Sequence, residues 1–276
     1  MNRRHLAILR KAAALFPVLI LSLSPLLSFP QGRTQTSPDP GLAGALKEAK
    51  AELQKGVNTW DLKTLESARN SFLGLLVKSR VSDGYLLYYA ALSDYRLASY
   101  HLSADNKAEA ERYALEGQQY ASKAAEALPS FGEAHALYAY LLALELAVHP
   151  EQAMTLGMQS MTWFAKAMEI GSENPRVNLL KGIYQLYVPA SFGGGPESAL
   201  EFLARSAALF EKEHVQDPLL PSWGKEEAYA YLGRVYRMTK DYARARSSLT
   251  KALAINPDCG LAKSELQALD KDEKDR

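Results

Sequence analysis

Residues 226–259 read EEAYAYLGRVYRMTKDYARARSSLTKALAINPDC, and this stretch decides the fold. Apolar and aromatic residues recur at helical spacing on both sides of a polar centre, Lys240-Asp241. This spacing places them on one face of each of two consecutive helices. The small residues Gly233 and Ala245 let the two backbones approach closely where the helices cross. The stretch therefore predicts an antiparallel helical hairpin.

The pattern resembles the tetratricopeptide repeat (TPR), with Tyr in the usual Trp place and Leu in the usual Phe place. Asn256-Pro257 is expected to stop the second helix and start the next, because Pro is tolerated in a first turn. The resemblance implies stacked hairpins with a concave binding surface. The matching positions are Tyr229, Leu232, Gly233, Tyr236, Ala245, Leu249, Ala252 and Pro257.

Less regular versions of the pattern precede this repeat. Gly56 and Ala68 are separated by the same number of residues as Gly233 and Ala245 in the repeat at 226–259. In the second hairpin, however, Asp94 stands where the repeat pattern expects a Tyr. Residues 130–133 read SFGE, a capping-box pattern for a helix start. The sequence has no sustained alternation of apolar and polar residues, so it predicts no strands. We expect an all-α, right-handed TPR-like solenoid of about five hairpins plus a C-terminal cap helix. The expected hairpins and cap cover residues 45–80, 84–129, 130–167, 174–203, 226–259 and 261–269.

The N-terminal residues have the layout of a secretory signal. Four basic residues precede the uncharged apolar run 12–29, and a stretch rich in Pro, Gly, Ser and Thr follows. We expect a signal peptide at 1–32, or an uncleaved membrane anchor at 12–29, then a linker at 33–44 and the repeat domain at 45–276. This layout predicts an exported protein, periplasmic or secreted, that contacts the membrane only through this segment if it is uncleaved.

Composition excludes several classes of protein. The chain has 276 residues and a formal net charge of +1, and the signal segment supplies four of its basic residues and no acidic ones. A balance this neutral gives no electrostatic case for nucleic acid. The single Cys259 excludes an internal disulfide framework and a multi-cysteine metal site. None of the five histidines has the spacing of a metalloprotease helix. We therefore expect no metal, no cofactor and no catalytic residue.

The glycine run 193–195 is the most unusual local feature. Three glycines before a helix start could present backbone N–H groups to an anion. However, no Lys-Ser or Lys-Thr pair follows, and Glu197 already places negative charge at that helix start. The alternatives are a tight loop with Pro196 in the first helical turn, or a loop that borders a binding surface.

Tyrosines mark the expected binding surface. Tyr85, Tyr88, Leu92 and Tyr95 fall on one face of a first helix. By the spacing of TPR proteins this face points into the concave groove. Tyr and Arg often anchor interfaces, although Tyr also packs routinely between hairpins. The three tryptophans are expected to be core or inter-hairpin anchors. The candidate partner-binding residues are Tyr85, Tyr88, Leu92, Tyr95, Tyr140, Arg234 and Arg237.

These observations predict a non-catalytic scaffold of the bacterial periplasm or cell envelope that holds a protein or peptide in its concave groove. The alternative is an accessory component of an envelope transport or assembly system, which binds a small ligand or a solute-binding protein in a pocket. A groove that is open along its length favours the first function, and a closed pocket favours the second.

Overall fold

The computed structural model describes residues 40–79 and 83–275. The expected signal segment, the possible anchor and most of the expected linker lie outside these residues. The described chain is helical, with two short 3-10 helices, η1 (Pro150–Gln152) and η2 (Ala190–Phe192), and no strand. The α-helices are α1 (Pro40–Thr59), α2 (Leu62–Lys78), α3 (Gly84–Ser103), α4 (Lys107–Ala127), α5 (Gly132–Val148), α6 (Ala153–Gly171), α7 (Pro175–Tyr187), α8 (Pro196–Phe210), α9 (Lys225–Met238), α10 (Tyr242–Ile255) and α11 (Gly260–Lys274).

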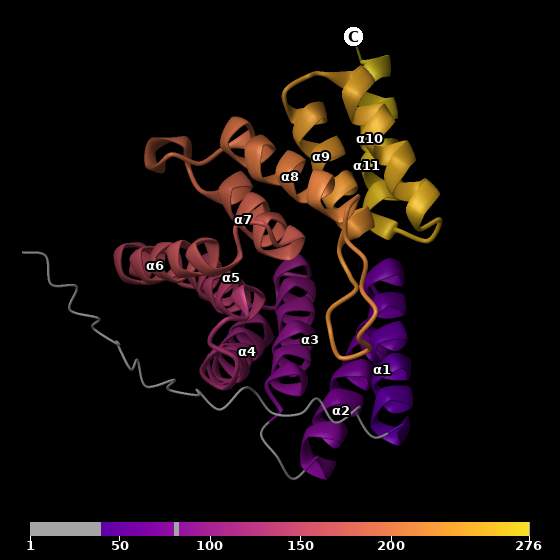
Figure 1. The fold of residues 1–276 in the computed structure, drawn as a ribbon. Coiled ribbons are helices and arrows are strands. Elements are labelled where there is room, and N and C mark those ends of the chain that lie inside the picture. Colours follow the sequence, from indigo (N-terminus) through magenta and orange to yellow (C-terminus); the bar gives the residue numbers. More distant parts are fainter. Residues whose placement is uncertain (1–39, 80–82, 276) are drawn as a thin grey trace, which may run out of the picture. The chain divides into compact units, whose positions relative to one another are not determined.

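Consecutive α-helices pair into five hairpins, and α11 packs behind α9 and α10 as the cap helix (Figure 1). The predicted all-α, TPR-like solenoid is confirmed. The helix α1 begins at Pro40, inside the stretch 33–44 where we expect a linker. Proline fits the first turn of a helix, and Leu46 and Ala49 of the following turns are already buried.

The two helices of a hairpin approach each other most closely at small residues, as the repeat pattern predicts. A methyl group at Gly233 in α9 would overlap the side chain of Leu249 in α10. The fourth hairpin repeats this arrangement, because a Cβ atom at Gly182 would lie 2.7 Å from Cγ of Leu203. The glycines therefore permit close approach of the paired helices.

Three hairpins turn through the same local structure. The turn after the first helix contains a residue with positive φ, at Trp60 (50°), Asp105 (55°) and Lys240 (61°). The next residue accepts a hydrogen bond from a backbone N–H of the second helix, through the side chains of Asp61, Asn106 and Asp241. Such side-chain caps satisfy donors that a helix start leaves unpaired.

The expected capping box at 130–133 is wrong. The helix α5 begins at Gly132 without a side-chain cap. Glu133 instead accepts hydrogen bonds from Oη of Tyr88 (2.9 Å) and Nδ2 of Asn174 (2.8 Å). A buried carboxylate needs polar partners, and here these partners come from other helices instead of the local backbone.

The first hairpin lies against the last helices of the chain. Asn58 at the end of α1 accepts a hydrogen bond from Nδ2 of Asn256 (3.0 Å), and its carbonyl oxygen packs directly on Gly260 at the start of α11. Nε2 of Gln54 in α1 donates to Glu226 of α9 (2.8 Å). These contacts join residues about two hundred positions apart in the sequence.

Residues 211–224, here called the crossing segment, connect α8 to α9 and extend to the first hairpins (Figure 1). Nζ of Lys50 in α1 donates to the carbonyl oxygens of Pro218 (3.1 Å) and Leu220 (2.8 Å). Oη of Tyr89 in α3 donates to the carbonyl oxygen of Leu219 (3.1 Å). Three carbonyl groups of the crossing segment therefore bind side chains of α1 and α3.

No helix within residues 40–79 and 83–275 combines the length and the apolar character that crossing a membrane requires.

Candidate functional site

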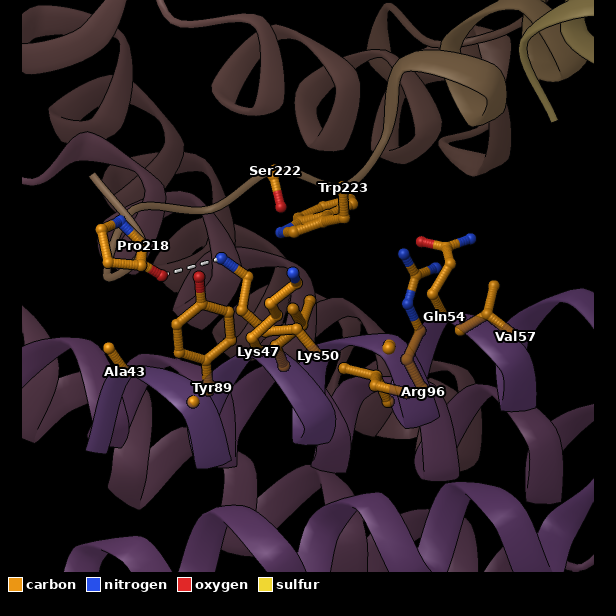
Figure 2. A pocket seen from close by; sticks show the side chains of 14 residues that line it. Ala43, Lys47, Lys50, Gln54, Val57, Tyr89, Arg96, Pro218, Ser222 and Trp223 are labelled. Atoms are coloured by element: carbon orange, nitrogen blue, oxygen red, sulfur yellow. Dashed lines mark hydrogen bonds between the residues drawn. The ribbon is translucent and has the colours of Figure 1, made fainter. Parts of the chain in front are cut away.

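A pocket of about 570 Å³ lies between α1, α3 and the crossing segment (Figure 2). Its volume falls in the range of small-molecule sites. Leu53 and Val57 of α1 and Leu92 of α3 give it an apolar surface. Trp223 of the crossing segment lies over this surface, and Tyr89 lines it from α3. The lining is therefore mainly apolar and aromatic.

The charged residues that line the pocket are all basic. They are Lys47 and Lys50 of α1 and Arg96 of α3, and neither Asp nor Glu is among the lining residues. Lys47 is exposed, whereas Lys50 is partly buried beneath the crossing segment. Burial lowers the pKa of Lys50 to about 8. The charge of Arg176 adds to this effect, and the charges of Asp217 and Glu133 oppose it.

Arg96 is neutralised by a buried partner. Its Nη1 and Nη2 atoms donate to the two carboxylate oxygens of Glu227 in α9 at 2.8 and 2.6 Å. The guanidinium carbon lies 4.6 Å from the ring centroid of Tyr95 and 5.0 Å from that of Trp223. Burial alone would lower the pKa of Arg96, but the charge and hydrogen bonds of Glu227 raise it above its ordinary value. The pair thus links α3 to α9 behind the pocket.

A second buried network continues from Trp223. Its Nε1 donates to Oη of Tyr88 (2.9 Å), and this hydroxyl donates to Glu133 (2.9 Å). Burial raises the pKa of Glu133, while the charge of Arg176 and the hydrogen bonds from Asn174 and Tyr88 oppose the rise. The network holds the crossing segment, α3, α5 and α7 together.

The expected groove residues of α3 and α5 do lie together, but most of them contact other parts of the chain. Tyr88, Tyr95 and Tyr140 are buried, and the rings of Tyr95 and Tyr140 meet edge to face with centroids 5.1 Å apart. Tyr85 is half-buried and packs edge to face on Phe131. Leu92 is the one expected residue that lines the pocket.

Arg234 and Arg237 lie elsewhere, between α9 and α11. Their Nε atoms donate to the two carboxylate oxygens of Glu265 at 2.7 and 3.1 Å. Nη1 of Arg237 also donates to Asp272 (2.8 Å), and Nη1 of Arg234 donates to Oη of Tyr187 (2.8 Å). In the structure these arginines hold the cap helix, and binding of a partner by any of the seven expected residues stays a prediction.

The repeat positions of the last hairpin behave as packing residues. Tyr236 is half-buried, and Tyr229 donates from its hydroxyl to Glu211 (2.8 Å). Pro257 lies between α10 and α11, so the expectation that it occupies the first turn of the next helix is wrong; α11 starts at Gly260. The remaining positions are buried, namely Leu232, Gly233, Ala245, Leu249 and Ala252.

The glycine run 193–195 forms a tight loop. Its three backbone N–H groups donate to the carbonyl oxygens of Ala190, Pro189 and Gln185. Gly193 and Gly195 have φ values of 80° and 108°, and Pro196 follows in the first turn of α8. Because these N–H groups bind the chain itself, the structure favours the tight-loop interpretation over an anion site.

Within the described residues, no group of three or more His, Cys, Asp and Glu side chains is arranged to hold a metal ion. Cys259 is buried, and burial raises the pKa of its thiol to about 11. A thiol in this state is a poor nucleophile at neutral pH.

Sequence reasoning missed most of the pocket. Lys47, Lys50, Arg96 and the crossing segment carried no local signal, and Trp223 was expected only as an anchor. The usable signal was the mixture of basic and apolar residues on one face of α1. Whether this face of α1 lines a pocket depends on which distant segment covers it.

Comparison with known protein families identifies one repeat in the chain. Residues 226–259 match the family described as tetratricopeptide repeat. These residues are a TPR. No protein of curated function matches the chain significantly by sequence.

Among solved structures, the chain is similar to the HusA haemophore from Porphyromonas gingivalis. The two are 27% identical with a TM-score of 0.59, and the match covers 72% of this chain and 94% of that chain. It is also similar to a thermophilic TPR protein from Thermus thermophilus. Here the identity is 17% and the TM-score 0.51, over 80% of this chain and 98% of that chain. The second similarity shows the TPR-like fold alone.

Proposed function

We propose that this protein is a non-catalytic binding protein that holds a small organic ligand in the pocket between α1, α3 and the crossing segment. The observation that carries this proposal is the lining, an apolar and aromatic surface with basic groups at its edge. Small-molecule sites combine these features. TPR-like solenoids commonly serve as binding scaffolds, which agrees with a binding role.

The similarity to the haemophore supports a small ligand and suggests haem as one candidate. Haem offers a flat apolar ring system and two carboxylates, which suit the apolar surface and the lysines of the pocket. The lining has no His, Met or Cys that could bind the iron, and the hydroxyl of Tyr89 donates to Leu219. Any haem would therefore be held through its ring and its carboxylates.

Blocking the pocket tests the proposal. Gly44 lines the pocket and Gly157 of α6 does not, and a Cβ atom added at either position would meet no atom within 4 Å. Gly44→Phe should therefore fold normally and fill the pocket, and Gly157→Phe is its matched control. Titration calorimetry with haemin and with metal-free protoporphyrin should show binding by the wild type and the control and weakened binding by Gly44→Phe. Equal binding by both variants would contradict the assignment.

A protein partner is the second candidate function. Met154, Met158 and Met161 of α6 are 76%, 62% and 58% exposed and lie on one helical face. Exposed methionines are common on adaptable binding surfaces. If a partner binds here, Met158→Lys with Met161→Lys should reduce its recovery from envelope extracts. Recovery of the same partners by the double variant and by the wild type would count against this surface.

Export remains part of the proposal and is supported by the charge and apolar pattern of residues 1–32. N-terminal sequencing of the protein recovered from the cell envelope tests it. A new N-terminus near residue 33 would indicate a cleaved signal, and an intact Met1 would indicate that the segment is retained.

A further inference from the structure

We propose that the ligand of this pocket is an amphipathic organic carboxylate, with its acid group between Lys47 and Lys50 and its apolar body on Leu53, Val57 and Leu92. The inference rests on the proposed function and goes further, because it states the chemical class of the ligand and the two side chains that recognise it.

Charge gives the first reason. Of the three basic side chains that line the pocket, Arg96 already binds both oxygens of Glu227. Lys47 forms no ion pair with any described residue, and Lys50 donates only to uncharged carbonyl oxygens. The lining therefore contributes two positive charges and no acidic residue, although the charges of Asp217 and Glu133 act on Lys50 from outside it, and an anion is the complementary ligand.

The placement of the two lysines gives the second reason. Lys47 and Lys50 are three residues apart, so they share one face of α1. Figure 2 shows both side chains extending from α1 toward the crossing segment, where Lys50 donates to the carbonyl oxygen of Pro218. A single carboxylate can accept hydrogen bonds from two ammonium groups in this arrangement. Because bonds to a charged acceptor are stronger than bonds to a carbonyl, such a group can compete with Pro218 and Leu220 for Lys50.

The apolar part of the pocket gives the third reason. From Lys50 to Val57 the helix α1 advances by about 10 Å, and Leu53, Val57 and Leu92 cover this length. A peptide bound here would bring an N–H and a C=O group for each residue, and these groups need partners. Gln54 is the one polar side chain that α1 offers beyond Lys50. A hydrocarbon chain or a flat ring system meets no such cost.

The test uses the full chain, titrated by calorimetry with dodecanoate, its matched alcohol dodecanol, and metal-free protoporphyrin. The wild type should bind the carboxylates and should prefer dodecanoate to dodecanol by roughly tenfold or more, as expected for a charge-assisted hydrogen bond. The double variant Lys47→Gln, Lys50→Gln should lose this preference and still bind dodecanol. Lys55→Gln, on the same helix but outside this pocket, is the matched control and should keep the preference.

The outcomes separate the two proposals. Equal affinity of the wild type for dodecanoate and dodecanol would overturn the carboxylate assignment and leave the small-molecule pocket standing. A preference for dodecanoate that survives the double lysine variant would also overturn it. No binding of any of the three probes by the wild type would overturn the proposed function itself. Tighter binding of protoporphyrin than of dodecanoate, with loss in the double variant, would support the inference and identify a flat dicarboxylate as the better ligand.

Discussion

At the scale of single residues, buried charges hold the wall of the pocket in place. Arg96 and Glu227 are 5% and 4% exposed, and they form two hydrogen bonds to each other. Removing one partner of such a pair leaves an uncompensated buried charge. The pair joins α3 to α9, so it acts between hairpins that are far apart in the sequence.

Arg96→Met should therefore lower the free energy of unfolding by about 3–5 kcal/mol. The double variant Arg96→Met, Glu227→Gln should recover part of this loss, because it no longer buries an unpaired charge. Denaturant unfolding measures both effects. Arg246→Met, which breaks an exposed pair with Asp270, is the control and should cost less than about 1 kcal/mol. Equal losses for the buried and the exposed pair would contradict this explanation.

The pH dependence of ligand binding is also set at single residues. The pKa of Lys50 is about 8, so its side chain is charged below this pH. Burial and the charge of Arg176 lower this pKa, and the charges of Asp217 and Glu133 raise it. The pKa of Tyr89 is raised mainly by burial, so this neighbour stays neutral. The affinity for dodecanoate should thus be highest below pH 8 and fall as pH rises through about 8. Lys50→Gln should flatten the profile in this range, and an unchanged profile would contradict the role of Lys50.

At the scale of elements, the close approach of paired helices depends on a glycine, as at Gly233 between α9 and α10. The contact requires a residue without a side chain at Gly233, because any Cβ atom would overlap Leu249. Gly157 in α6 has no atom within 4 Å of a Cβ atom at that position. The two glycines therefore serve different purposes, although both lie within helices.

Gly233→Ala should destabilise the protein by roughly 1–3 kcal/mol, because the crossing must widen. Gly157→Ala should stabilise it by about 0.5–1 kcal/mol, since alanine favours a helix more than glycine does. Thermal unfolding of the two variants should move the midpoint in opposite directions. Shifts of the same sign and size would show that close packing at Gly233 is not required.

At the scale of the whole molecule, the contact between the first hairpin and the last helices positions α1, which lines the pocket. α1 supplies both lysines and part of the apolar surface, Leu53 and Val57, and its end packs on α11 at Asn58 and Gly260. A side chain at Gly260 would overlap the carbonyl oxygen of Asn58. Loss of this contact should therefore affect binding as well as stability.

Gly260→Ala should lower the free energy of unfolding by roughly 1–3 kcal/mol and weaken dodecanoate binding measurably. Calorimetric unfolding and titration on the same samples measure the two effects. Gly74→Ala in α2 is the control, because a Cβ atom there has open space and Gly74 does not line the pocket. Normal ligand affinity in a destabilised Gly260→Ala would separate the pocket from this contact.

The sequence by itself determined the helical hairpins. Helix spacing and small residues such as Gly233 act within about thirty residues, so they can be recognised along the chain. These local signals predicted five hairpins and a cap helix, and the structure confirms them.

Only the tertiary structure decided the candidate site. The pocket needs Lys50, Arg96 and Trp223, which come from three segments that meet because the last hairpins pack against the first. The same packing turned Tyr88 into a buried donor to Glu133, which no local pattern indicates. Helix formation depends on neighbours in the sequence, whereas a pocket depends on which distant surfaces exclude water together.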